Sequence, residues 1–270
     1  MKISLLTDAP KHNLALMTIS WWHKSLGDEI KLNMPLWKSD KTYASVLFDW
    51  NKDKFFADIY GGPAYGGGRV FSCPADYSLF NLDYSLGYTY RYCPRKCSFC
   101  KVKDLEKNKS HSSIWSFHNG MFNKICLLNN NTFADPKWEE TFKEIWDADL
   151  TVIDENGYDL RLMDEEKADA LKRTKFQGKI HYAWDQIEDE KEILRGLTIA
   201  PKGHVYVLIG YNTSMEEDIH RCQKIVDLGH DPYIMPYNQS KKEKIFKRFI
   251  DSFMWRKYRT IEKAWRQYQK

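Results

Sequence analysis

Residues 93–100 read Cys93-Pro-Arg-Lys-Cys97-Ser-Phe-Cys100 and place three cysteines within one short stretch of a 270-residue chain. The spacing Cys-x3-Cys-x2-Cys allows a single loop to bring three thiolates to three corners of an iron–sulfur cube. No fourth cysteine stands nearby, so one iron of such a cube would have no protein ligand. An open coordination position can bind a small molecule, as it does in catalytic zinc sites. The stretch therefore predicts a reactive iron–sulfur centre.

The same three thiolates also suit a structural zinc site, with Cys73, Cys126 or a histidine as the fourth ligand. Structural zinc sites usually combine two half-sites, and no second half-site is found in the chain. A disulfide framework fits less well, because the cysteines are sparse and a chain of this length buries a core without cross-links. Cys126 and Cys222 stand in apolar surroundings and are expected to be inert core thiols.

The three cysteines, together with Phe99 directly before the last of them, resemble the signature of the radical S-adenosylmethionine (radical SAM) enzymes. The resemblance implies a 4Fe–4S cluster on Cys93, Cys97 and Cys100, with S-adenosylmethionine (SAM) bound to the open iron. In that family the reduced cluster cleaves SAM and releases a 5′-deoxyadenosyl radical. The electron donor is then expected to be a flavodoxin- or ferredoxin-like protein. The cofactors carry the chemistry while the protein positions them.

Residues 1–80 are predicted to form a small Rossmann-like α/β unit. Pro10 precedes a helical pattern that ends at Gly27. Strands are expected at 2–7, 30–32, 44–48 and 57–60, and the last runs into the glycine-rich stretch 61–68. No helical pattern follows these glycines, which favours a turn or linker over a dinucleotide-binding loop.

This unit resembles a shortened cobalamin-binding domain of the kind that precedes many radical SAM cores. The family's Asp-x-His-x-x-Gly motif is missing, because the matching loop reads Asp8-Ala-Pro-Lys-His12-Asn13. His12 stands in a different register and the glycine is absent. We therefore expect the unit to bind no cobalamin, and to shield one side of the core from water and oxygen.

Residues 81–240 alternate between strand and helix patterns, which indicates a parallel sheet. Strands are expected at Leu86–Tyr92, Lys124–Leu128, Leu150–Ile153, Lys179–Trp184, His204–Ile209 and Pro232–Met235. Helices are expected near Lys137–Trp146, Asp164–Arg173, Glu188–Leu197 and Met215–Leu228. The resemblance implies that these elements form the partial (β/α)6 barrel of the radical SAM core.

Polar residues follow several of the expected strands, at the end of the sheet where β/α folds place their chemistry. The asparagines 129–131 and Asp135 stand where the family often has a Gly-Gly-Glu that binds the SAM amino group. Arg161 suits a carboxylate or another anion, although a surface ion pair is an equally good interpretation. With Phe99, the candidate cofactor-binding residues are Asn130, Asp135, Arg161, Asp185, Gly210, Glu216 and Met235.

Residues 241–270 carry eleven Lys and Arg residues against three acidic ones, although the net charge of the whole chain is only +4. We expect one basic, aromatic helix here. Its apolar stripe is predicted to contain Met254, Tyr258, Ile261, Trp265 and Tyr268. The stripe would dock on the core, and the charges are either simply solvated or contact nucleic-acid phosphates.

No apolar run approaches the roughly 18 residues of a membrane span, so no membrane partner is expected. The absence of a targeting segment and the free thiols favour a reducing cytoplasm. The leading functional expectation is a radical SAM enzyme that isomerises or rearranges a nucleic-acid base or its substituent. It rests on a resemblance to compact, often phage-carried proteins, some of which act in DNA hypermodification, and on the basic C-terminal region.

Two alternatives remain at this point. The first is a radical SAM enzyme that acts on a peptide or a small metabolite. The second is a non-enzymatic zinc or iron–sulfur module that binds nucleic acid. Fold and cofactor do not by themselves name a reaction.

Overall fold

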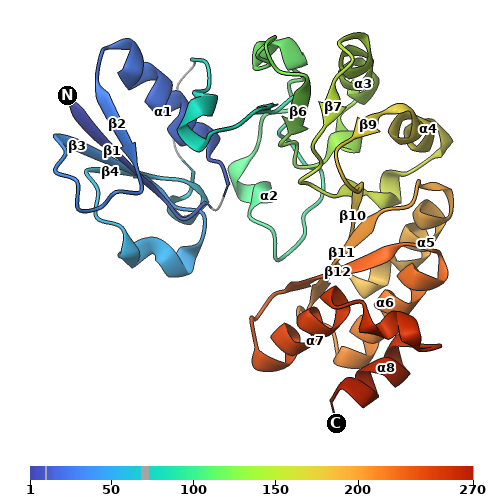
Figure 1. The fold of residues 1–270 in the computed structure, drawn as a ribbon. Coiled ribbons are helices and arrows are strands. Elements are labelled where there is room, and N and C mark those ends of the chain that lie inside the picture. Colours follow the sequence, from blue (N-terminus) through green and yellow to red (C-terminus); the bar gives the residue numbers. More distant parts are fainter. Residues whose placement is uncertain (10, 68–72, 270) are drawn as a thin grey trace.

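The computed structural model describes residues 1–9, 11–67 and 73–269. Its secondary structure is α/β, with three four-stranded sheets in which every strand pair is parallel (Figure 1). The predicted α/β class is therefore confirmed. Pro10 and Gly68, expected before the first helix and in the glycine-rich stretch, lie outside the described residues.

The N-terminal unit contains a sheet of order β2-β1-β3-β4 and one helix packed on it. Its elements are β1 (Lys2–Thr7), α1 (Leu14–Ser25), β2 (Glu29–Leu32), β3 (Lys41–Ser45) and β4 (Ile59–Gly61). The Asn13 side chain caps α1 by accepting a hydrogen bond from the Leu16 N–H. Leu16 and Ile19 then pack against Ile3 and Leu5 of the central strand.

Two strands of this unit differ from the prediction because side chains capture their backbone N–H groups. β3 ends at Ser45 and does not reach Phe48, since the Asp8 carboxylate accepts the N–H groups of Leu47 and Phe48 at 2.7 and 3.1 Å. β4 begins only at Ile59, because the Ala57 N–H binds the Tyr60 hydroxyl. Both strands are shorter at one end than predicted because of side-chain contacts that the hydrophobic pattern of the sequence does not reveal.

The core contains the other two sheets, of order β5-β6-β7-β9 and β8-β10-β11-β12. Their strands are β5 (Ser85–Gly87), β6 (Lys124–Leu127), β7 (Thr151–Val152), β8 (Tyr158–Asp159), β9 (Lys175–Phe176), β10 (His181–Trp184), β11 (His204–Ile209) and β12 (Asp231–Pro236). The helices between them are α2 (Val102–Leu105), α3 (Trp138–Asp147), α4 (Glu165–Arg173), α5 (Glu190–Ile199) and α6 (Met215–Asp227). In Figure 1, α3 to α6 lie along the outer side of the arc of strands.

The chain passes between the two core sheets three times, from β7 to β8, back from β8 to β9, and again from β9 to β10. At this junction the Asp154 carboxylate accepts the His181 N–H at 2.6 Å. Gly157 lies so close to Tyr182 that a Cβ there would stand 2.9 Å from its carbonyl oxygen. Hydrogen bonds among the described strands divide the core into two sheets and do not join it into one barrel.

The first core strand is shorter than predicted, and two strands were not predicted at all. β5 stops at Gly87 because the backbone N–H groups of Thr89 and Tyr90, shortly after it, bind the side chain of Asn129. β8 and β9 contain two residues each, too few for any periodic pattern.

The C-terminal region forms two helices, α7 (Lys241–Asp251) and α8 (Ile261–Tyr268), and the prediction of a single helix is wrong. Phe253 adopts a left-handed backbone conformation with φ of 53°, and Thr260 caps a new helix. Met254 and Tyr258 therefore lie outside α8 and are 45% and 42% exposed. The buried face of α8 instead contains Ile261, Ala264 and Trp265; Trp265 packs on Phe246 and Phe249 of α7.

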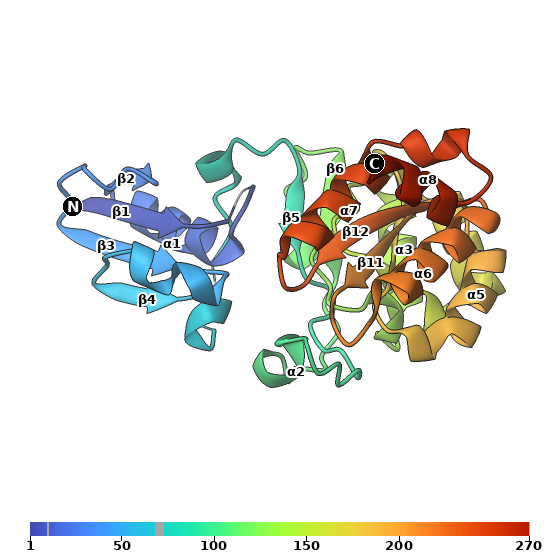
Figure 2. The same ribbon diagram turned by 90° about the horizontal axis from the view of Figure 1, so that it is seen from below.

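The N-terminal unit and the β10–β12 end of the core lie at opposite ends of the molecule (Figures 1 and 2). The unit contacts the core through a buried cluster in which Met17 of α1 and Tyr77 pack with Leu86 and Cys126. In the described part of the chain, no helix combines the length and the apolar character that crossing a membrane requires.

We expect Arg221→Leu to lower the free energy of unfolding by about 3 kcal/mol, because it removes one member of a buried ion pair. The Arg221 guanidinium is fully buried and donates to the Asp218 carboxylate and to the carbonyl oxygens of Trp184, Asp185 and Leu208. Urea denaturation measures the change.

The matched control is Arg266→Leu, which removes an exposed arginine that is paired with Glu262. Its expected effect is below about 1 kcal/mol. Equal losses in the two variants would contradict the structural role of Arg221.

Candidate functional site

The three cysteines lie in the loop that follows β5, on the edge of the sheet where parallel strands end. All three thiols are free and partly exposed. Burial raises the pKa of both Cys97 and Cys100, although Arg161 opposes this shift at Cys97. Metal binding would therefore have to displace protons from these thiols.

The donor set fits an iron–sulfur cluster in its chemistry, since one loop supplies three free thiols without a disulfide among them. Their arrangement is not that of a formed site. Across residues 1–9, 11–67 and 73–269, no three His, Cys, Asp or Glu side chains are grouped to hold a metal ion. A cluster would require the loop 93–100 to close around it.

Three consecutive asparagines after β6 hold the segment that leads into the cysteine loop. The Asn129 side chain accepts the N–H groups of Thr89 and Tyr90 at 2.9 and 3.0 Å and donates to the Thr89 hydroxyl. The Asn130 amide donates to the Arg91 carbonyl oxygen. The Asn131 amide lies 3.9 Å from the Cys93 sulfur. Asn130, predicted to bind a cofactor, is therefore engaged in positioning the loop.

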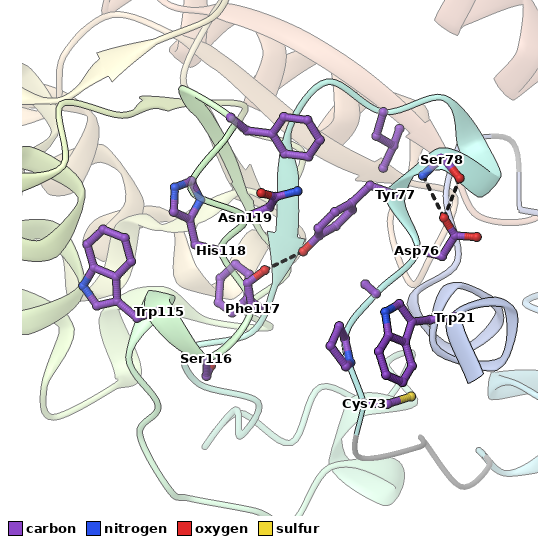
Figure 3. Close-up of a pocket in the computed structure, with 14 residues that line it drawn as sticks. Trp21, Cys73, Asp76, Tyr77, Ser78, Trp115, Ser116, Phe117, His118 and Asn119 are labelled. Carbon is purple, nitrogen blue, oxygen red and sulfur yellow. Dashed lines mark hydrogen bonds between the residues drawn. The ribbon is translucent and has the colours of Figure 1, made fainter. Parts of the chain in front are cut away.

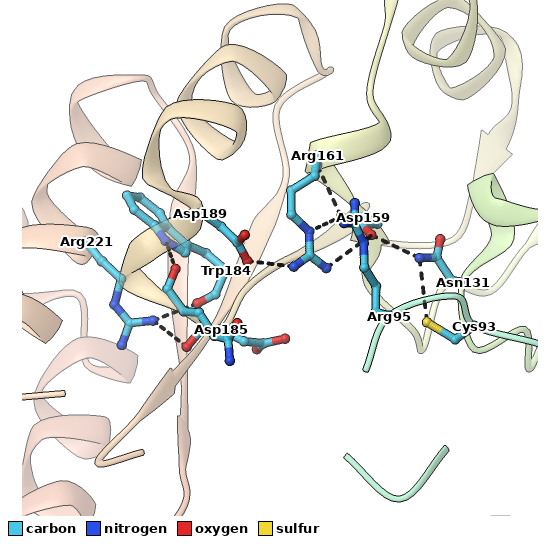
Figure 4. Close-up of polar contacts among 10 residues, drawn as sticks. Cys93, Arg95, Asn131, Asp159, Arg161, Trp184, Asp185, Asp189 and Arg221 are labelled. Atoms are coloured by element: carbon cyan, nitrogen blue, oxygen red, sulfur yellow. Dashed lines mark hydrogen bonds and ion pairs between the residues drawn. The ribbon is translucent and has the colours of Figure 1, made fainter. Parts of the chain in front are cut away.

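Asp159, at the end of β8, is the centre of a charged network beneath the loop (Figure 4). Its carboxylate accepts hydrogen bonds from Asn131 at 3.0 Å, from Arg95 at 3.2 Å and from the Arg161 Nε at 2.7 Å. Burial alone would raise the pKa of Asp159, but these donors, Arg161 above all, lower it overall. Through Arg95, the network joins the cysteine loop to Asp159 at the end of β8. Through Asn131, it also reaches the segment that follows β6.

Arg161 is predicted to bind an anion, and the structure gives it two carboxylate partners. It binds Asp159 through Nε and Nη2, and it binds Asp189 through Nη1 at 2.6 Å. These bonds use Nε and one N–H of each terminal nitrogen, so a second N–H remains on each terminal nitrogen. The structure therefore shows the ion pairs that the sequence analysis gave as the alternative to anion binding.

Asp185 directly follows β10 and is a predicted site residue whose carboxylate is largely buried. Its carboxylate has no hydrogen bond or ion pair to any described residue, although Arg161, Asp189 and Arg221 surround it (Figure 4). Burial raises the pKa of Asp185 to about 6, against the opposing effect of Arg161 and Arg221. A buried carboxylate that has a raised pKa and no hydrogen-bond donor in contact with it is typical of functional sites.

Phe99 and two tyrosines connect the cysteine loop to the far side of the core. The Phe99 ring meets Tyr211, after β11, edge to face at 5.2 Å, and Tyr211 meets Tyr237, after β12, at 4.7 Å. Ser98 also accepts a hydrogen bond from the Tyr211 hydroxyl. The loop therefore extends from the end of β5 to the ends of β11 and β12. Sequence reasoning missed both tyrosines, although Tyr211 directly follows the glycine it singled out.

Two other predicted residues have protein partners of their own. Asp135 is buried and binds the His111 ring at 2.7 Å and the Lys137 N–H at 2.9 Å, so it caps the turn before α3. Gly210 has a φ of 74°, and a Cβ there would stand 2.5 Å from the buried Glu243 carboxylate of α7. Helix packing by itself therefore accounts for glycine at this position.

The last two predicted residues lie apart from the charged network. Glu216 is exposed in the first turn of α6 and lines a hollow of about 490 Å³ beside Trp265 and Arg266 of α8. Met235 lies on β12 and is 45% exposed.

A cavity of about 1030 Å³ lies between the N-terminal unit and the core, and residues of both line it. On the side of the N-terminal unit it is lined by β3, by β4 and by the segment 11–16, which follows β1 and enters α1. Tyr88 and Arg91 before the cysteine loop, and Leu105 and Glu106 after it, line its core side. The cavity therefore borders both flanks of the loop.

We expect the stability of the protein to depend on pH through Asp185. Because its folded-state pKa of about 6 lies above the ordinary 3.8, the folded protein binds the proton more tightly than the unfolded chain. The resulting stability is present below about pH 4 and is lost as the pH rises through about 6. Asp185→Asn should therefore gain about 2 kcal/mol relative to the wild type between about pH 4 and about pH 7.

Urea unfolding at the two pH values measures this change. Asp169→Asn removes an exposed carboxylate of α4 and controls for net charge. Parallel pH profiles for Asp185→Asn and the wild type would contradict the raised pKa.

Comparison with known proteins adds no relative to this description. No family model matches the chain, and no curated protein matches it. The interpretation of the site therefore depends on its residues and their geometry.

Proposed function

We propose that the chain is a radical SAM enzyme that holds a 4Fe–4S cluster on Cys93, Cys97 and Cys100. The observation that carries the proposal is the position of this loop, whose free thiols follow the first strand of a parallel α/β core. In the proposal, the two core sheets are the two halves of one partial (β/α)6 barrel. The continuity of the chain from β7 to β8 and from β9 to β10 supports this interpretation.

The bound cluster would supply one-electron cleavage of SAM, with the electron delivered by a flavodoxin- or ferredoxin-like protein. The residues of the chain would orient and shield it. Asn131 and Arg95 fix the loop on Asp159, and Asp185 offers the free carboxylate for a hydroxyl group of the ligand. Phe99 and Tyr211 cover the far side of the loop and exclude water there.

The substrate class that we propose is a nucleic-acid base or its substituent, which the enzyme isomerises or rearranges, as in DNA hypermodification. The cavity of about 1030 Å³ beside the loop is the proposed place for it. Support for a nucleic-acid partner comes from the cations of the C-terminal region. Lys244, Arg248, Lys257, Arg259 and Lys263 are exposed and form no ion pair with any described residue.

Alanine in place of Cys93, Cys97 or Cys100 should remove the bound iron and abolish the formation of 5′-deoxyadenosine, because each thiolate holds one corner of the cluster. Anaerobic reconstitution followed by iron analysis, and then product analysis with dithionite and SAM, measures both. Cys73→Ser is the matched control, because this cysteine is also partly exposed and lies outside the loop.

A wild-type protein that takes up zinc and no iron, and that leaves SAM intact, would favour the non-enzymatic zinc module. Loss of iron in Cys126→Ala would contradict the open iron site, since the cluster would then have a fourth protein ligand.

Reversing two charges, Arg259→Glu with Lys263→Glu, should weaken the binding of single-stranded DNA and lower the salt slope of log K by about two. Both side chains are exposed and unpaired among the described residues, whereas the neighbouring Arg256 is bound to Asp231. Fluorescence anisotropy at several salt concentrations provides the measurement. Lys172→Glu on α4 is the control; an equal effect of that variant would remove this surface from the proposed function.

A further inference from the structure

A second cavity, of about 910 Å³, lies beside the segments that lead into β5 and β6, and Figure 3 shows its lining. Its position is set by the segment 115–122, which precedes β6, and by the segment 73–82, which precedes β5. The Asn119 N–H binds the hydroxyl of Ser85, the first residue of β5. The cysteine loop instead follows the last residue of that strand, so the two sites are separate.

Aromatic side chains form the walls and the floor of this cavity. Trp115 is 57% exposed and Trp21 is 38% exposed, and both rings line it. Tyr77 and Phe117 lie between them, and the Tyr77 hydroxyl donates to the Phe117 carbonyl oxygen at 2.7 Å, which fixes the floor (Figure 3). Indole rings that remain accessible offer flat faces on which another planar ring can stack.

The polar groups of the cavity are neutral or already satisfied. The His118 ring forms no hydrogen bond within the described residues, and burial lowers the pKa of His118, so the ring is neutral near pH 7. The Asn119 Oδ1 accepts the Met121 N–H, and its amide nitrogen has no acceptor among the described residues. The acidic group of the cavity, Asp76, is bound by Ser20, Ser78 and Lys24.

This combination excludes a strongly charged ligand and suits a flat ring that carries its own donors and acceptors. Apolar ring faces would meet the tryptophans, and ring nitrogens or carbonyl groups would meet His118 and Asn119. Purine and pyrimidine bases have these properties, because every base combines a π-face with hydrogen-bonding edges.

We propose that the cavity between Trp21 and Trp115 binds a purine or pyrimidine base, stacked on Trp115 and hydrogen-bonded to His118 or Asn119. The base belongs either to a free nucleoside or to an unpaired position of a single-stranded nucleic acid. The site is independent of the cysteine loop, so the inference does not rest on the proposed function.

Isothermal titration calorimetry of the full-length protein tests this inference, with adenosine, thymidine and a short oligothymidylate as probes. SAM is left out, because its adenine would compete for the cavity, and thymidine and the oligothymidylate are the deciding probes because they carry no adenine that could occupy a SAM site. Trp115→Ala should weaken binding about tenfold or more, because stacking supplies much of the affinity for a base. His118→Phe, which keeps the ring and removes its nitrogens, should weaken it several-fold. Trp50→Ala is the control, since this exposed tryptophan stacks on Phe48 away from the cavity.

Binding of the nucleosides identifies a free ligand, and binding of the oligonucleotide alone identifies an unpaired base in a strand. Either result supports the proposal if it is lost in Trp115→Ala with an unchanged circular dichroism spectrum. The proposal is overturned if no probe binds, if Trp115→Ala and Trp50→Ala behave alike, or if ribose 5-phosphate binds as tightly as adenosine.

Discussion

The hydrogen bonds that seat residues 89–93 on the end of β6 determine what the rest of the site can do. This segment leaves the sheet after Gly87, so its backbone polar groups need partners outside the strand ladder. Asn129, Asn130 and Asn131 provide them in sequence, at Thr89, at Arg91 and at the Cys93 sulfur. The position of the first cysteine thus follows from three adjacent asparagine side chains in the segment after β6.

Asp159 extends this arrangement by one further step. Its lowered pKa keeps the carboxylate ionised, and the ionised group holds Asn131, Arg95 and Arg161 at once. Arg161 is thereby paired with Asp159 and Asp189, while the Asp185 carboxylate, whose pKa is raised, has no partner among the described residues. Two carboxylates on neighbouring strands therefore have opposite roles, because one has cationic partners in direct contact and the other is mainly desolvated.

The sequence predicted long elements well, and its errors arose where distant side chains intervene. β1 and β11 have the expected bounds, because six-residue runs with a buried face carry a clear signal. The ends of β3 and β5, by contrast, are set by Asp8 and Asn129, which are remote in the chain. Likewise, Asp135 and Gly210 follow expected strands, as cofactor-binding residues often do. In the structure, however, Asp135 binds His111, and Gly210 packs against Glu243. The cysteine motif could be recognised from the sequence because its three residues lie within eight positions of one another.

The central claim is that the cysteine loop holds a cluster with one iron open to SAM. Mössbauer spectroscopy of protein reconstituted anaerobically with iron-57 tests this claim most directly. The account predicts a 4Fe–4S spectrum in which SAM changes the signal of a single iron and leaves the others as they were. A spectrum that SAM does not alter, or a protein that binds no iron under these conditions, would contradict it.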